Sequence, residues 1–150
     1  MYKIRDWLYV SDYPSACSKR IRDEAGIQGM LQLFQAIDAE DVDCKYLPIG
    51  DGLQLQTSQI EDAIAFIKEQ HTKNHCLLST CGAGLSRSVM FAVIALKEIE
   101  GLSMDDAYRA IFKHHPNAMP DHVHWKTIAE YYGEDDNFWK VWGDLSMGDL

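Results

Sequence analysis

The chain has 150 residues, of which 47% are hydrophobic and 25% are charged, and this balance predicts a single globular domain over residues 1–150. Its net charge of −9 at pH 7 repels polyanions, so nucleic acid and acidic membrane surfaces are unfavourable partners. No apolar run is long enough to cross a bilayer, and Lys3, Arg5 and Asp6 stand where a secretion signal would be apolar. We therefore expect a cytoplasmic protein, and we expect it to act as a monomer.

The first half of the chain alternates between short apolar runs, which are typical of strands, and apolar residues at helical spacing. Turn residues and helix caps separate these segments. The predicted elements are a strand over 3–10, a helix from Ser15 to about Gly26, strands over 29–34 and 43–49, a helix from Thr57 or Ser58 to about 72–74, and a strand over 75–80.

The second half of the chain is predicted to be helical. A helix over 87–100 ends at Gly101, a second begins after Ser103 and runs to about 114, and a third has Pro120 in its first turn and runs to about 132. Residues 134–150 are an acidic and aromatic tail, in which we expect one helical turn over 138–142 and then a loose end. Strands that alternate with helices predict an α/β fold, with a central, mostly parallel sheet flanked by helices on both faces.

The segment between the strand over 75–80 and the helix over 87–100 is a loop of small residues that begins at Cys81. Such a loop lets successive backbone N–H groups converge beside the positive end of the next helix, and this arrangement binds phosphate. Arg87 adds a planar set of donors that suits two oxygens of a phosphate group. The predicted phosphate-binding residues are Gly82, Ala83, Gly84, Leu85, Ser86 and Arg87.

Cys81 opens the same loop, so the field that attracts phosphate also favours a thiolate, which is the nucleophilic form of cysteine. We predict that this thiolate attacks phosphorus, and that the Ser88 hydroxyl assists departure of the sulfur in a second step. Asp51 follows a predicted strand between Gly50 and Gly52, 30 residues before Cys81, and is the candidate general acid. This chemistry requires no cofactor and no metal.

Two simpler interpretations stay open for these residues. The loop could be a glycine turn that caps a helix and contains a buried cysteine, and Asp51-Gly52 could be an ordinary turn dipeptide.

The order Cys-x-Ala-Gly-x-Ser-Arg-Ser over residues 81–88 resembles the phosphate loop of small (atypical) dual-specificity protein phosphatases, within the cysteine-based protein tyrosine phosphatases. The resemblance extends to about residue 132 and includes the Pro48-x-x-Asp51 segment, which is similar to the family's general-acid segment. It implies a phosphoprotein substrate that carries phosphotyrosine, and also phosphoserine or phosphothreonine. Thr80 stands where the family usually has His, so we expect a less stabilised thiolate, and Gln32 stands where the family often has Asn.

Other functions fit these residues less well. Relatives that share the loop hydrolyse phosphoinositides or RNA 5′-phosphates, but residues 82–86 contain no Lys or Arg for such highly charged substrates. A sulfurtransferase or arsenate reductase of the rhodanese type fits less well, because the five residues between Cys81 and Arg87 and the candidate acid Asp51 suit phosphate better. A phosphoprotein-binding module with little activity typically lacks Cys, Arg or Asp, and all three are present here.

The remaining histidines, cysteines and tryptophans are expected to be structural. We predict solvated or capping roles for the six histidines rather than metal binding. Three of the four cysteines are expected to be small buried hydrophobic residues, and two tryptophans of the tail are expected to pack against the domain. These residues are Cys17, Cys44, Cys76, Trp139 and Trp142.

Overall fold

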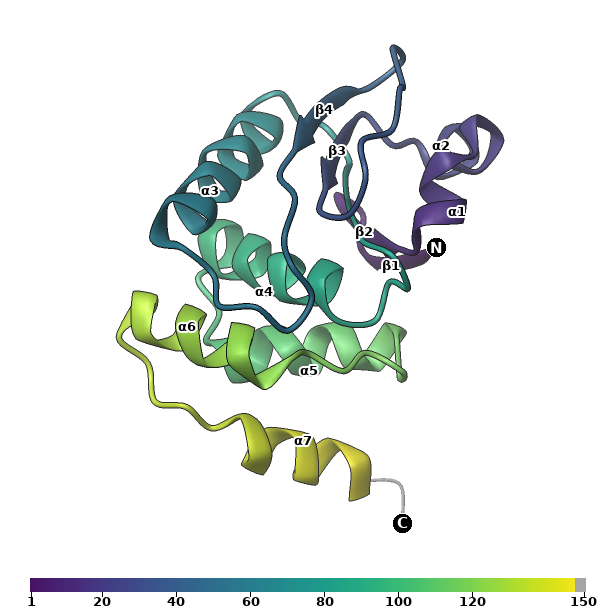
Figure 1. The fold of residues 1–150 in the computed structure, drawn as a ribbon. Coiled ribbons are helices and arrows are strands. Elements are labelled where there is room, and N and C mark those ends of the chain that lie inside the picture. The colour runs from purple at the N-terminus through teal and green to yellow at the C-terminus, as the bar shows by residue number, and fades with distance from the viewer. Residues whose placement is uncertain (148–150) are drawn as a thin grey trace.

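The computed structural model describes residues 1–147, and within this range five short strands form one central sheet (Figure 1). The strand order is β1-β2-β5-β3-β4; β1 and β2 pair antiparallel, and the other neighbours pair in parallel. The predicted α/β fold with a mostly parallel sheet is therefore confirmed. The strands are β1 (Tyr2–Arg5), β2 (Leu8–Ser11), β3 (Gly29–Gln32), β4 (Asp43–Tyr46) and β5 (Leu77–Thr80).

Helices cover both faces of this sheet (Figure 1). The short helices α1 and α2 lie on one face, α3 and α4 lie on the other, and α5 and α6 pack outside α4. The helices are α1 (Tyr13–Cys17), α2 (Lys19–Ala25), α3 (Thr57–Thr72), α4 (Arg87–Glu100), α5 (Met104–His114), α6 (His122–Tyr132) and α7 (Phe138–Met147). None of the helices in residues 1–147 has the length and apolar character that crossing a membrane requires.

The alternation of side chains along β3 and β5 builds two cores. Met30 and Leu78 join the smaller apolar cluster under α1 and α2, whereas Leu31 and Leu77 join the larger cluster under α3 and α4. Helix α4 is buried continuously from Ser88 to Leu96, because the sheet, α3, α5 and α6 surround it. Its N-terminus is therefore held firmly at the carboxyl end of β5, where ligands bind in open α/β sheets.

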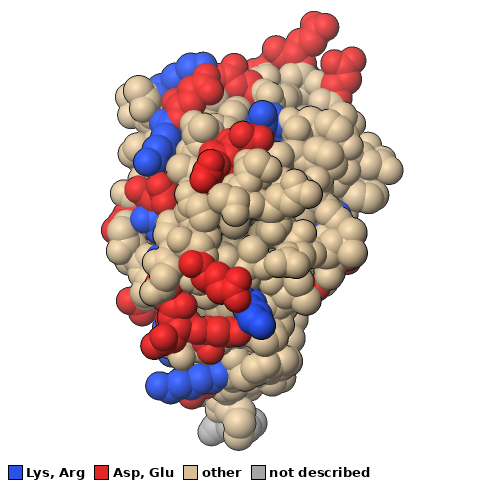
Figure 2. Space-filling view, turned by 60° about the vertical axis from the view of Figure 1, so that its left-hand side comes forward, with Lys and Arg blue, Asp and Glu red and all other residues tan. Residues whose placement is uncertain are grey.

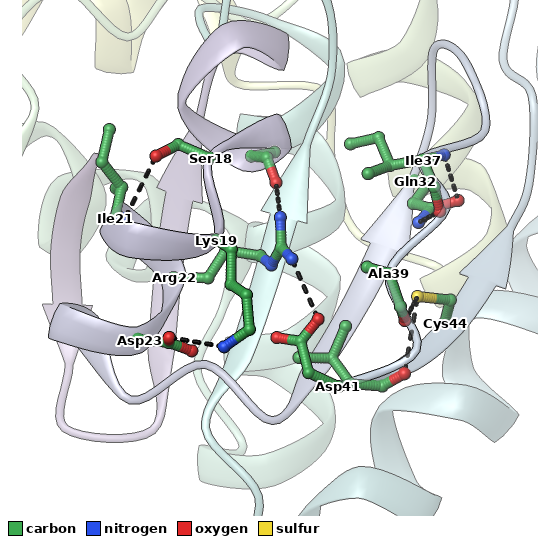
Figure 3. Close-up of polar contacts among 12 residues, drawn as sticks. Ser18, Lys19, Ile21, Arg22, Asp23, Gln32, Ile37, Ala39, Asp41 and Cys44 are labelled. Carbon is green, nitrogen blue, oxygen red and sulfur yellow. Dashed lines mark hydrogen bonds and ion pairs between the residues drawn. The ribbon is translucent and has the colours of Figure 1, made fainter.

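Arg22 links the α1–α2 layer to the connection between β3 and β4 (Figure 3). Its side chain is almost fully buried; it donates to the Ala16 carbonyl at 2.8 Å and to the Asp41 carboxylate at 3.0 Å. A buried guanidinium without such partners would be costly. The Ala16 contact joins α2 to α1, and the Asp41 contact joins α2 to the connection between β3 and β4.

Several predicted boundaries were wrong near the N-terminus. The strand expected over 3–10 is divided into β1 and β2, because the chain turns back at Asp6 and Trp7. The helix expected over 15–26 is divided into α1 and α2, because Ser18 is extended and its hydroxyl caps α2 by accepting from the Ile21 N–H.

The C-terminal elements also differ from expectation. Pro120 precedes α6 instead of lying in its first turn, since the Asp121 side chain caps that helix. The tail forms the helix α7 rather than one turn and a loose end, and Phe138 and Val141 bury its inner side against the larger core. Trp139 is 59% exposed, and its ring lies 5.5 Å from that of His122 in α6, so it contacts the surface of the domain and is not buried in it. The tail was expected to run to residue 150, and residues 148–150 lie outside the described part.

Candidate active site

Cys81 lies directly after β5, at the start of the loop that leads into α4. The residue is 2% exposed, and its Sγ atom lies 3.2 Å from the Ser88 hydroxyl oxygen in the first turn of α4. When the sulfur is ionised it can only accept, so the Ser88 hydroxyl then donates to it. The pair has the geometry for a serine that stabilises a thiolate.

The carbonyl groups of the phosphate loop are held from outside the loop. Three of them accept hydrogen bonds from two neighbouring segments. Gly82 accepts from the Tyr13 N–H at 3.0 Å, and the α5–α6 connection donates to Gly84 through His115 Nε2 at 2.7 Å and to Leu85 through the Met119 N–H at 2.8 Å. By contrast, no backbone N–H of residues 82–87 donates to another group within the described residues 1–147. Outward carbonyls and free amides make the loop a concave set of donors, which is the requirement for binding a phosphate group.

Gly84 allows the loop to pass close to the end of β2. Its φ is +73°, and a Cβ at this position would lie 2.7 Å from the Asp12 backbone nitrogen and 2.8 Å from the Ser11 carbonyl carbon. Only glycine fits both the left-handed backbone and this close approach.

Thr80 connects the end of β5 to the end of β2. Its buried hydroxyl lies 3.2 Å from the Ser11 carbonyl oxygen and 3.0 Å from that of Asp12, to which it can donate in turn. The partners of Thr80 thus belong to the β2 end and not to the phosphate loop itself. The less stabilised thiolate expected from Thr80 stays a prediction.

Arg87 is the first residue of α4, and its side chain turns toward the loop. Nη1 donates to the Ile49 carbonyl at 3.0 Å, which fixes one edge of the guanidinium. Nη2 lies 3.4 Å from where a Cβ on Gly82 would stand, and Nε lies 3.9 Å from the Asp51 Oδ1 atom. The edge formed by Nε and Nη2 therefore faces the loop and Asp51, where a phosphate could be held by two parallel hydrogen bonds.

Asp51 lies on an exposed turn opposite the phosphate loop. Its side chain is 70% exposed, whereas that of Arg87 is 12% exposed, so the carboxylate is at the open side of the site. The turn is tied to α6, because the buried His124 donates through Nε2 to the Leu53 carbonyl at 2.7 Å. The structure thus brings Cys81, Arg87, Ser88 and Asp51 together, although 30 residues separate Asp51 from Cys81.

His115 and His124 are supporting residues that the sequence interpretation missed. Both are completely buried, and each holds one of the loops that form the site. The prediction of a solvated or capping role was therefore wrong for His124, whereas His115 is buried but does occupy the C-cap position of α5. No sequence pattern indicates these contacts, since His115 lies 31 positions from Gly84 and His124 lies 71 positions from Leu53.

The other cysteines lie apart from this chemistry. Cys17 and Cys44 are exposed and Cys76 is partly buried, so the prediction that all three are buried was wrong. Burial raises the pKa of the Cys76 thiol to about 11, which keeps it protonated at neutral pH.

A surface pocket of about 400 Å³ lies beside the site and not within it. Its lining does not include Cys81 or Arg87, so it lacks the nucleophile and the guanidinium of the phosphate site. It is formed by Gln54 and by five residues of α6, namely His122, Val123, Lys126, Thr127 and Glu130.

The sequence is similar to those of dual specificity protein phosphatases. The family model described as "Dual specificity phosphatase, catalytic domain" matches residues 8–134. Dual specificity protein phosphatase 6 of Homo sapiens is 31% identical over 125 residues, which are 79% of this chain and 33% of that protein. The chain thus spans about a third of the length of this curated relative.

Solved structures share the fold at low sequence identity. Human DUSP28 has a TM-score of 0.81 and 18% identity, with 89% of this chain and 96% of that chain covered. PTPMT1 in complex with PI(5)P has a TM-score of 0.77 and 14% identity, with 88% and 94% covered.

Proposed function

Because the chain belongs to the family of dual specificity phosphatase catalytic domains, we propose that it hydrolyses phosphate monoesters on proteins. The observation that carries the proposal is the buried Cys81 sulfur, which lies beside the Ser88 hydroxyl at the base of a loop whose amides are free. A nucleophile and an anion site that coincide in this way suit phosphoryl transfer better than acid–base chemistry alone.

In the first step the Cys81 thiolate attacks phosphorus in line with the ester oxygen. A sulfur–phosphorus bond forms and the phosphorus–oxygen bond of the ester breaks. The loop amides and the Nε and Nη2 donors of Arg87 hold the equatorial oxygens, and Asp51 gives a proton to the departing oxygen. The products are the dephosphorylated side chain and a phosphocysteine.

In the second step water attacks the phosphocysteine, and Asp51 takes a proton from this water. The sulfur–phosphorus bond breaks, inorganic phosphate leaves, and the thiolate returns. The Ser88 hydroxyl supports this step, because it can donate to the sulfur as negative charge reappears there.

A phosphoprotein suits this site better than a more highly charged substrate. Residues 82–86 contain no Lys or Arg, and the chain carries a net charge of −9. On the face drawn in Figure 2, acidic and basic side chains are interspersed, without a continuous basic area. Phosphoinositides and RNA 5′-ends carry more negative charge and would need basic residues that the loop lacks. This holds although PTPMT1, a fold neighbour, was solved with PI(5)P.

A cytoplasmic location, a monomeric state and the avoidance of nucleic acid and membrane surfaces stay predictions from composition and charge.

The test is the Cys81→Ser variant, measured with an aryl phosphate and with phosphopeptides. We expect kcat to fall by at least about a thousandfold while phosphopeptide affinity is retained, because the serine hydroxyl is not ionised and the amides and Arg87 remain. Cys76→Ser is the matched control and should keep full activity, since that thiol lies outside the site. Retained turnover in Cys81→Ser would overturn the covalent mechanism.

A further inference from the structure

Phe34 places an exposed aromatic ring at the mouth of the phosphate loop. The residue is 38% exposed and belongs to neither of the two buried apolar clusters. The guanidinium carbon of Arg87 lies 5.5 Å from the centre of its ring, and a Cβ on Gly82 would lie 3.9 Å from the ring. The ring thus borders the position that the phosphate group would occupy between Arg87 and the loop.

The backbone of Phe34 is fixed in this position from both sides. Its preceding residue, Leu33, is fully buried, and the Leu33 N–H donates to the Thr80 carbonyl at 3.0 Å, one residue before the nucleophile. On the other side, the Gln32 amide donates to the Ile37 carbonyl at 3.1 Å and accepts from the Ile37 N–H at 3.2 Å (Figure 3). These two bonds close residues 33–36 into a short loop.

A second aromatic residue supports the ring. Tyr13, at the start of α1, meets Phe34 edge to face, with ring centres 5.5 Å apart and planes at 90°. The Tyr13 N–H also donates to the Gly82 carbonyl, so the same residue holds both the ring and the phosphate loop.

Isolated exposed apolar residues are common and need no function. Phe34 differs because three contacts hold it in place while its ring stays exposed. Its backbone lies in a closed loop, the Tyr13 ring is perpendicular to it, and the Arg87 guanidinium lies beside it. The ring belongs to neither apolar core, so we look for its role in the apolar surface that it exposes beside the phosphate loop.

We propose that Phe34, supported by Tyr13, forms an aromatic wall that packs against the ring of a phosphotyrosine side chain. This proposal rests on the function proposed above and makes it more specific, since it gives phosphotyrosine an advantage over phosphoserine and phosphothreonine. A phenyl ester presents a π-face and an edge to the wall, whereas the short alkyl esters of serine and threonine do not. The expected advantage from one such aromatic contact is about 10-fold in affinity.

Binding to the Cys81→Ser protein tests this wall without turnover. Two peptides of identical sequence, one with phosphotyrosine and one with phosphothreonine, are titrated by calorimetry. We expect Phe34→Ala to weaken phosphotyrosine binding about 10-fold and phosphothreonine binding less than about 2-fold, while Phe34→Leu, which keeps apolar volume, gives an intermediate loss. The control Trp139→Ala removes a ring on α7 that is more exposed than Phe34, and it should change neither affinity.

The parent protein and its three variants are then made with Cys81 restored, and kcat/KM is measured on both peptides. We expect the preference for the phosphotyrosine peptide to be lost in Phe34→Ala. Equal losses for the two peptides, no loss, or a gain for both would overturn the aromatic wall while leaving phosphatase activity intact. If the protein with Cys81 has no turnover, the proposed function fails; a phosphotyrosine preference that Phe34→Ala removes in the binding assay would still support the wall.

Discussion

Asp12 and Asp51 both lie near the phosphate loop, but their carboxylates have different surroundings. Asp12 caps α1, and its Oδ1 atom accepts from the Ser15 N–H at 2.9 Å. Partial burial opposes ionisation of Asp12, yet hydrogen bonds from Ser15 outweigh it and hold the pKa of Asp12 below its usual value. Asp12 is therefore committed to the helix as an anion, whereas Asp51 faces Arg87 across the open side of the site.

The first prediction concerns Asp51 as the proton donor. Asp51→Asn should lower kcat about 100-fold for a phosphothreonine peptide, whose leaving alkoxide needs a proton, and less than about 10-fold for p-nitrophenyl phosphate, whose leaving group does not. Steady-state kinetics on the two substrates measure the difference. Equal losses would assign the general acid to another group.

At the scale of elements, the site is one strand–loop–helix unit held by three neighbours. The β2 end contacts it through Ser11 and Asp12, the segment between α5 and α6 through His115 and Met119, and the acid turn through the Ile49 carbonyl. Because each neighbour holds a different part of the unit, the backbone amides of the phosphate loop already point inward before a ligand binds. Such preorganisation is what makes hydrogen bonds effective in a transition state.

Gly84→Ala tests how tightly the loop is packed on β2. We expect kcat/KM to fall at least about 100-fold and the free energy of unfolding to fall by about 1–3 kcal/mol, because the loop must shift and the left-handed backbone is strained. Activity assays and urea denaturation measure the two effects.

Gly101→Ala is the matched control for this substitution. Gly101 has a similar φ of +70° at the end of α4, but a Cβ there meets no atom within 4 Å. It should lower stability modestly and leave kcat/KM unchanged. Similar kinetic losses in the two variants would mean that general destabilisation, and not the contact with β2, accounts for the effect of Gly84→Ala.

At the scale of the whole molecule, few polar contacts connect the thin α1–α2 layer to the rest of the fold. The apolar cluster on this side has five buried residues, so the ion pair of Arg22 with Asp41 has a larger share in fixing the layer than a surface pair would have. The hydrogen bond from Arg22 holds the pKa of Asp41 below its usual value of 3.8.

This shift predicts a dependence of stability on pH. A depressed pKa in the folded protein stabilises it above the unfolded pKa, and this stabilisation disappears as pH falls through the folded value. Asp41→Asn should therefore be less stable than wild type at pH 7, and the two should converge below about pH 3.8. Urea denaturation at several pH values measures the difference, and a gap that is independent of pH would contradict the role given to the ion pair.

The sequence by itself determined the unit of strand, small-residue loop and helix, and it located Cys81, Arg87 and Ser88 within eight consecutive positions. This was possible because the geometry of that unit is local: glycines allow the turn, and the following apolar run forms α4. The α/β class followed for a similar reason, since periodicity and turn residues are read along the chain. The roles of these residues stay predictions that the variants above test.

Only the tertiary structure decided what surrounds this unit. Nothing in the order of residues indicates that His115 holds Gly84, that His124 holds the Asp51 turn, or that Phe34 lies beside Arg87. Each of these contacts joins segments more than 30 positions apart, and it exists because the packing of helices and strands brings those segments to one edge of the sheet. The helix and strand propensities of individual residues carry no information about these contacts, because long-range packing determines which distant side chains touch.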